Sequence, residues 1–73
     1  MDVQIDRNRS IPTQIVEDLR SRITDSRLAP GDPLPSTRIL ARELGVSRGS
    51  VVSAYEQLAG EGFLVAGPGG TRV

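Results

Sequence analysis

The sequence of 73 residues predicts a mainly α-helical domain of the α+β class, with three helices followed by a small β-hairpin. Three observations support this prediction. Apolar residues recur at helical spacing over residues 11–26, and two shorter apolar patterns meet at a glycine-containing turn. Near the end, a Gly/Pro-rich turn separates a short apolar run from a segment that can return as its partner strand. A chain of this length forms one domain, whose core buries only roughly 60% of the surface that the unfolded chain exposes.

The first helix is expected over residues 11–26, after an N-terminal arm of residues 1–10. Ser10 can cap this helix, and Pro12 falls in its first turn, where the missing N–H does no harm. An apolar residue then recurs at every fourth position: Ile11, Ile15, Leu19 and Ile23.

Two further helices are expected close together. Ser36 can cap a helix that runs to Leu44, and Ser47 can cap another that runs to Gly60. Gly45 follows the first of them and can adopt the left-handed conformation that ends a helix. The residues expected to face inward are Ile39, Leu40 and Leu44 from the first helix, and Val51, Ala54, Tyr55 and Leu58 from the second.

Turns and short strands account for the rest of the chain. Residues 28–33 predict a turn. Leu34 is expected to form a tiny strand that can pair with the later hairpin. The prolines on either side of it lack N–H donors, so this strand can lie only at an edge. Gly62 should end the third helix. The hairpin is expected as a strand at 63–65, a turn at 67–70 and a partner strand at 71–73.

The short connection Gly45-Val46 between two helices predicts a helix-turn-helix. Ala41 lies four residues before Gly45, where the helices cross closely and a larger side chain would clash. Apolar residues occupy the positions that lock the two helices together: Leu40, Leu44, Val46, Val51 and Ala54. With the hairpin that follows, residues 11–73 are predicted to form a winged helix-turn-helix. An αα-hairpin from an unrelated small bundle is the alternative.

The second helix of such a unit, here about 47–60, lies in the DNA major groove with its first residues on the base edges. The candidates for DNA contact at this end are Ser47, Arg48, Gly49, Ser50 and Ser53. Arg48 is the long donor that can reach a base or a phosphate, and Gly49 permits close approach. Simpler readings stay open: Ser47 as a cap alone, Arg48 as a solvated side chain, and Ser50 and Ser53 as surface residues.

Further candidates flank this helix. Arg38 can reach the DNA backbone or bases beside Arg48, and Thr37 can help it with a phosphate. The turn at 67–70 is the expected wing tip, which would enter the minor groove or touch a phosphate. Its candidates are Gly69, Gly70 and Thr71, although an ordinary hairpin turn explains them equally well.

Composition excludes several other functions. The absence of Cys and His excludes disulfides, metal sites built from these residues and nucleophile–histidine pairs. No pair of Asp or Glu residues stands in an apolar setting that would raise a pKa, so an independent enzyme has almost no support. No apolar run approaches the ~18 residues of a membrane span, and the N-terminus lacks the order of a signal peptide. We expect a cytoplasmic protein without membrane contact.

The formal net charge is zero, whereas nucleic-acid-binding domains are usually basic. All nine basic residues are Arg, and residues 36–73 contain four Arg against three Glu. The neutral total keeps a second function open, a winged-helix module that binds protein. The start of the third helix, Ser-Arg-Gly-Ser, favours DNA, and the salt dependence of binding would distinguish the two functions.

Four motifs resemble the GntR family of bacterial transcription regulators, over residues 11–73. They are Leu28-Ala29-Pro30-Gly31-Asp32, Leu34-Pro35-Ser36-Thr37-Arg38, Leu44-Gly45-Val46-Ser47-Arg48 and Glu61-Gly62-Phe63-Leu64. The segment 51–58 is most similar to the MocR/PdxR subfamily. The resemblance implies a dimer that reads paired half-sites in a DNA operator through Arg38, Ser47, Arg48, Ser50 and the wing glycines. In some subfamilies a further Arg reads bases from the position of Val52. Ser26 stands where a glycine is usual.

The resemblance also implies a C-terminal part outside these residues. In the MocR/PdxR subfamily that part resembles a type I aminotransferase and binds pyridoxal 5′-phosphate. The present sequence has no Lys, so only its N-terminal amine could form a Schiff base. We therefore expect no cofactor in these residues, and self-association mainly through the C-terminal part. Whether the protein activates or represses stays open.

Overall fold

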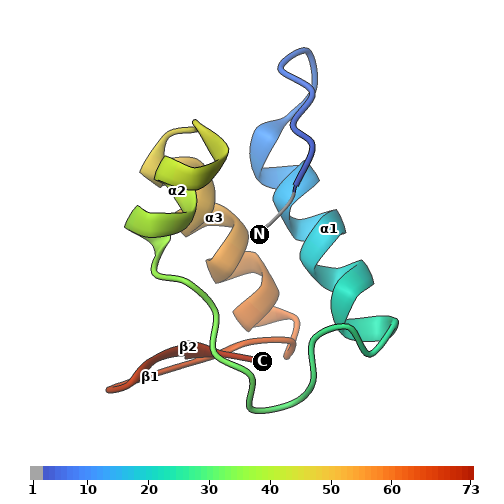
Figure 1. Ribbon diagram of the computed structural model, residues 1–73, viewed down its shortest axis with the longest axis vertical. Helices are drawn as coiled ribbons and strands as arrows, with labels where there is room; N and C mark the ends of the chain where they lie inside the picture. Colours follow the sequence, from blue (N-terminus) through green and yellow to red (C-terminus); the bar gives the residue numbers. More distant parts are fainter. Residues whose placement is uncertain (1–2) are drawn as a thin grey trace.

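The computed structural model describes residues 3–73. The elements are, in order, α1 (Ile11–Thr24), α2 (Thr37–Leu44), α3 (Arg48–Gly60), β1 (Val65–Gly67) and β2 (Gly70–Arg72). Helix α3 packs against both α1 and α2, and the hairpin projects from one end of the three-helix bundle (Figure 1). The predicted order of helices and hairpin is confirmed.

Each helix begins at a serine, as the sequence predicts. The side chains of Ser10, Ser36 and Ser47 accept hydrogen bonds from backbone N–H groups three residues later, at Thr13, Ile39 and Ser50. Such a cap satisfies one of the N–H groups that a helix start leaves without a partner.

Helix α1 ends at Thr24, two residues before its predicted end. Ser26 follows with a φ of 63°, in the left-handed region that favours glycine. The N–H groups of Arg27 and Leu28 both donate to the carbonyl of Arg22, at 2.8 and 3.0 Å, which closes the helix end. Ser26 therefore lies in a backbone conformation that favours glycine, the residue that is usual there in the family that the sequence resembles.

The core lies between the three helices. The largest fully buried side chains are Ile15, Val16, Leu19, Leu40, Val51 and Leu58. Ile39 does not face inward as predicted, because 48% of its surface is exposed. Leu40 and Ala41 together form the buried face of the short helix α2. Adjacent helical residues point about 100° apart, so Ile39 lies on the opposite side of the helix from the centre of this face and turns toward solvent.

The two strands of the hairpin are shifted along the sequence from their predicted positions. β1 and β2 are antiparallel, with Gly67 opposite Gly70. β1 begins only at Val65, because Leu64 is buried in the core and the N–H of Phe63 still donates to Leu58 at the end of α3. The N–H of Leu34 donates to the carbonyl of Thr71 at 2.9 Å, which confirms a short edge segment beside the hairpin.

Tyr55 connects α3 to the segment before α2. Its hydroxyl donates to the carbonyl oxygen of Pro35 at 2.7 Å, and its ring is buried in the core. Burial and, to a lesser extent, the negative charge of Glu43 together raise the pKa of Tyr55 to about 12. The folded domain therefore holds this hydroxyl in its neutral form.

We expect alkali to destabilise the domain through Tyr55. An unfolded tyrosine loses its proton near pH 10, whereas the folded one keeps it to about pH 12. The contribution of Tyr55 to the free energy of unfolding should be fully present below pH 10 and should decrease as the pH rises, by about 1.4 kcal/mol at pH 11. Urea unfolding across this range measures the loss. The sequence has one Tyr, no Cys and no Lys, so Tyr55→Phe should show a flat profile here. A parallel decline in that variant would contradict the assignment.

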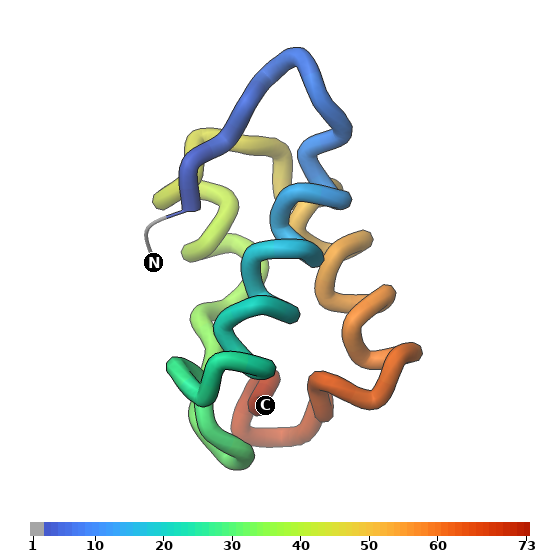
Figure 2. The backbone as a smooth tube through the Cα atoms, turned by 90° about the vertical axis from the view of Figure 1, so that its right-hand side faces the viewer, coloured from blue at the N-terminus to red at the C-terminus, as the bar shows by residue number. Residues whose placement is uncertain are grey.

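The N-terminal arm, residues 3–9, packs against the helices. Gln14 is buried, and its side chain exchanges two hydrogen bonds of 2.7 Å with the backbone N–H and carbonyl of Asp6. Ile5 packs against the core. Figure 2 shows the arm at the same end of the molecule as the connection between α2 and α3.

Candidate nucleic-acid interface

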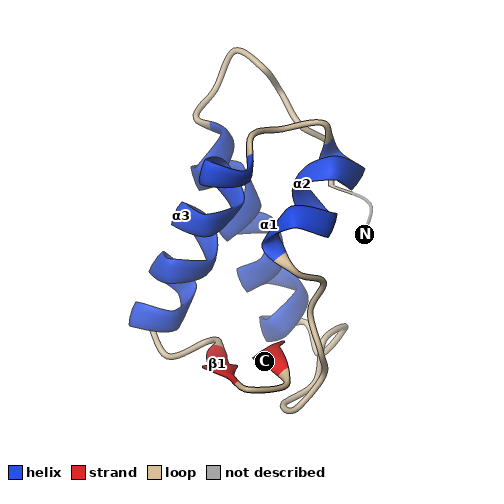
Figure 3. Ribbon diagram, turned by 90° about the vertical axis from the view of Figure 1, so that its left-hand side faces the viewer, coloured by secondary structure: helices blue, strands red, loops and turns tan. Residues whose placement is uncertain are grey.

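The turn between α2 and α3 has the predicted geometry. Gly45 adopts a left-handed φ of 67°, and the N–H of Val46 donates to the carbonyl of Ala41 at 3.0 Å. Ala41 itself is buried in the core. The turn fixes the start of α3 next to α2 (Figure 3).

The nine arginines divide into two groups. Four of them pair with carboxylates on α1, next to it or at the end of α3, with N···O distances of 2.6–3.3 Å: Arg9–Glu17, Arg20–Glu61, Arg22–Asp18 and Arg27–Asp25. Hydrogen bonds from Arg20 and Gln57 hold the pKa of Glu61 below its usual value. Within residues 3–73 the other five form no ion pair: Arg7, Arg38, Arg42, Arg48 and Arg72. The zero net charge therefore does not reveal where these five arginines lie on the surface.

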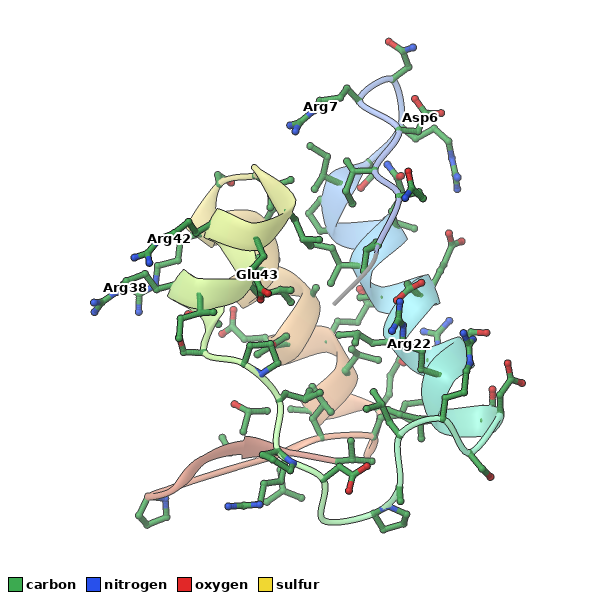
Figure 4. The ribbon with its side chains drawn as sticks, in the orientation of Figure 1. Asp6, Arg7, Arg22, Arg38, Arg42 and Glu43 are labelled. Carbon is green, nitrogen blue, oxygen red and sulfur yellow. The ribbon has the colours of Figure 1, made fainter. Side chains whose placement is uncertain are left out.

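Three of these five arginines line one hollow of about 420 Å³ on the surface of α2 and α3. Its lining residues are Ser36, Thr37, Arg38, Ile39, Arg42 and Arg48. Figure 4 shows Arg38 and Arg42 projecting to the same side of α2, with Glu43 on the other side. Like charges gathered with no carboxylate between them raise the local positive potential, which attracts anions.

Arg48 is held across the gap between the two helices. Its Nε donates to the hydroxyl of Thr37 at 3.2 Å. This contact brings together the predicted site residues Thr37, Arg38 and Arg48. Arg42 is not among the predicted site residues, although its position four residues after Arg38 places both on one helix face.

Ser47 and Ser50, at the start of α3, have a structural role in the helix itself. Ser47 caps it, and the hydroxyls of Ser47 and Ser50 lie 2.9 Å apart. The cap explains Ser47 without any ligand. Ser53 is exposed one turn further along, and no hydrogen bond to another described residue restrains its hydroxyl.

Gly49 has no structural need to be glycine. Its φ is not in the left-handed region, and an added Cβ would meet only Ser47 Oγ, at 4.0 Å. A glycine inside a helix costs roughly 0.5–1 kcal/mol relative to alanine. The domain thus keeps a bare patch of backbone at the exposed start of α3, although alanine would stabilise the helix.

The hairpin forms a second patch, separate from the arginine hollow. Gly69 lies at its tip, and Gly70 has a φ of 104°, which requires glycine. Thr71 is half-buried, and its carbonyl accepts the hydrogen bond from the N–H of Leu34. Arg72 donates to the carbonyl of Gly31 at 3.1 Å and so holds the base of the hairpin. The structure therefore does not bring the wing residues into the cluster around Arg48.

The fold and the arginine-lined start of α2 and α3 define a winged helix-turn-helix domain, the class expected of transcription regulators. Residues 12–73 match the family model described as bacterial regulatory proteins, gntR family, and the chain belongs to this family. It is a domain of a DNA-binding transcription regulator and not an enzyme.

Two curated relatives support the predicted subfamily. The chain is 58% identical over 65 residues to the pyridoxine biosynthesis transcriptional regulator PdxR of Corynebacterium glutamicum, covering 88% of the chain and 14% of that protein. It is 40% identical over 62 residues to the probable rhizopine catabolism regulatory protein MocR of Rhizobium meliloti, covering 82% of the chain and 13% of that protein. The chain thus spans about one seventh of these relatives.

Solved structures share the fold. YtrA from Sulfolobus acidocaldarius, a GntR-family transcription factor, matches with a TM-score of 0.88 and 36% identity, over 99% of this chain and 77% of that one. AraR(DBD), solved in complex with operator ORR3, matches with a TM-score of 0.78 and 30% identity, over 86% of this chain and 77% of that one. A similar domain therefore binds operator DNA.

Within residues 3–73, none of the helices is long and apolar enough to cross a membrane. That part of the chain also contains no group of three or more His, Cys, Asp or Glu side chains that could hold a metal ion.

Proposed function

We propose that this domain binds a specific operator sequence by placing the start of α3 in the major groove. The observation that carries the proposal is the arginine hollow, whose exposed Arg38, Arg42 and Arg48 form no ion pair with any carboxylate of residues 3–73. Arg48 extends from the helix start, where a guanidinium can donate two hydrogen bonds to a guanine. Arg38, with Thr37, would bind the phosphate backbone beside it.

The small residues of α3 complete this contact. Gly49 lets the backbone approach the DNA, which would explain a glycine that the domain itself does not require. Ser47, Ser50 and Ser53 carry hydroxyls that can donate to phosphates or bases, and the helix N-terminus favours a phosphate. At the hairpin, Gly69, Gly70 and Thr71 would meet the minor groove or the backbone.

We also propose that two copies act together on paired half-sites. One domain presents a small contact surface and has no net charge, so a second linked copy would add strongly to its affinity. As in the family that it resembles, the pairing would come mainly from a C-terminal part, similar to an aminotransferase and able to bind pyridoxal 5′-phosphate. Operator binding would then control transcription in response to a ligand of that part.

Salt dependence tests DNA binding by this chain. Duplexes selected by the chain from a randomised pool should share one motif, and their affinity should fall steeply as salt rises. Arg38→Ala should weaken all duplexes similarly and reduce the slope of log K against log salt by about 0.9, the share of one phosphate. The charge-matched control is Arg27→Ala, whose guanidinium pairs with Asp25. We expect it to leave the slope unchanged.

Two results would overturn the proposal. Failure of the chain to bind any duplex at low salt would favour the protein-interaction module instead. Binding that does not respond to salt would exclude a role for the arginine hollow. A loss in Arg38→Ala that is confined to one base position would move Arg38 from backbone contact to direct base readout.

A further inference from the structure

The N-terminal arm carries an arginine to the turn of the helix-turn-helix. Arg7 Nη2 donates to the carbonyl oxygen of Gly45 at 2.9 Å, although the two residues are 38 positions apart. The same nitrogen lies 3.3 Å from where a Cβ on Gly45 would stand. The guanidinium therefore rests directly on the turn glycine, two residues before the cap of α3.

The position of Arg7 is set by the folded domain. The neighbouring Asp6 is fixed through its backbone by the buried Gln14, whose amide also donates to the carbonyls of Arg9 and Ser10, at 3.3 and 3.2 Å. Ile5 packs against the core on the other side of Asp6. Arg7 is therefore held in place from both directions along the chain.

Arg7 forms no ion pair with a carboxylate of residues 3–73. A guanidinium has five N–H donors, and in residues 3–73 only the contact with Gly45 uses one of them. Arg9, in the same arm, instead pairs with Glu17 on α1 at 3.3 Å. Figure 4 shows Arg7 pointing to the side of the molecule where Arg38 and Arg42 project.

We propose that Arg7 binds a DNA phosphate next to the start of α3, while it stays bonded to Gly45. The arm would then extend the DNA contact beyond the helix-turn-helix and add a fourth arginine to those of the hollow. Arginine suits this position, because its planar fork can donate to a carbonyl and a phosphate at once. The inference rests on the proposed function, since it needs DNA against the same face.

Salt titration of matched arm variants tests this contact. The probe is a fluorescein-labelled duplex of mixed sequence, because a phosphate contact does not depend on base identity. Arg7→Ala should reduce the slope of log K against log salt by about 0.9. Its deficit relative to the unmodified chain should therefore shrink about threefold when salt is raised fourfold. Arg9→Ala removes the same charge from the same arm and should keep the full slope.

A second pair of variants separates charge from support of the turn. Arg7→Lys keeps the cation and should restore most of the slope, whereas Arg7→Gln keeps an N–H donor without charge and should behave like Arg7→Ala. A full slope in Arg7→Ala, with a reduced slope in Arg38→Ala, would overturn the arm contact and leave the proposed function standing. Absence of duplex binding by the unmodified chain would overturn both.

Discussion

Replacing Leu40 by alanine is expected to destabilise the domain by about 2–5 kcal/mol, the range for deleting most of a fully buried leucine side chain. Leu40 lies in α2 with none of its surface exposed, and it belongs to the core cluster that includes Val51 and Ala54 of α3. The substitution leaves a cavity between the two helices of the helix-turn-helix. A domain of this size has a total stability of roughly 4–11 kcal/mol, so the loss is a large share of it.

Thermal and urea unfolding measure this effect. Each kcal/mol should lower the Tm by about 4–8 °C in a domain of this length. The matched control is Ile39→Ala, the adjacent aliphatic residue in the same helix. Ile39 is about half exposed, and alanine is the better helix former, so we expect a loss below about 1 kcal/mol. Equal losses in the two variants would contradict the burial of Leu40 and the exposure of Ile39.

Replacing Arg48 by alanine is expected to weaken operator binding by about 1–3 kcal/mol and to relax the preference at one base pair. Arg48 is exposed at the start of α3 and is oriented by its hydrogen bond to Thr37. The substitution leaves no carboxylate without its partner, because Arg48 forms no ion pair with a described residue. Its effect on stability should stay within about 0.5 kcal/mol, so the lost affinity reports DNA contact.

Competition between the selected operator and its single-base variants identifies the role of Arg48. If it reads a guanine through both arms of its fork, Arg48→Lys should keep much of the salt dependence and lose the base preference. If it binds a phosphate, Arg48→Lys should recover most of the affinity on every duplex. Arg27→Ala again serves as the charge-matched control. Unchanged operator affinity in Arg48→Ala would remove Arg48 from the proposed interface.

Local interactions in this protein could be read directly from the sequence. A serine cap needs only the N–H groups of the next turn, so Ser10, Ser36 and Ser47 predict the helix starts. The left-handed Gly45 likewise depends on the backbone of its own turn. These features determined the order of the elements and placed Arg48 at the exposed start of α3.

The tertiary structure decided the features that depend on packing between distant segments. The spacing of Ile39 and Leu40 is compatible with burial of either residue, and only the packing of α2 on α3 selects Leu40. The same holds for charge, because the pairing of Arg20 with Glu61 joins positions 41 apart. Sequence composition counts such charges but does not assign their partners. The neutral total therefore concealed the arginines that form no ion pair within residues 3–73, including Arg7, and these distinguish the proposed DNA face.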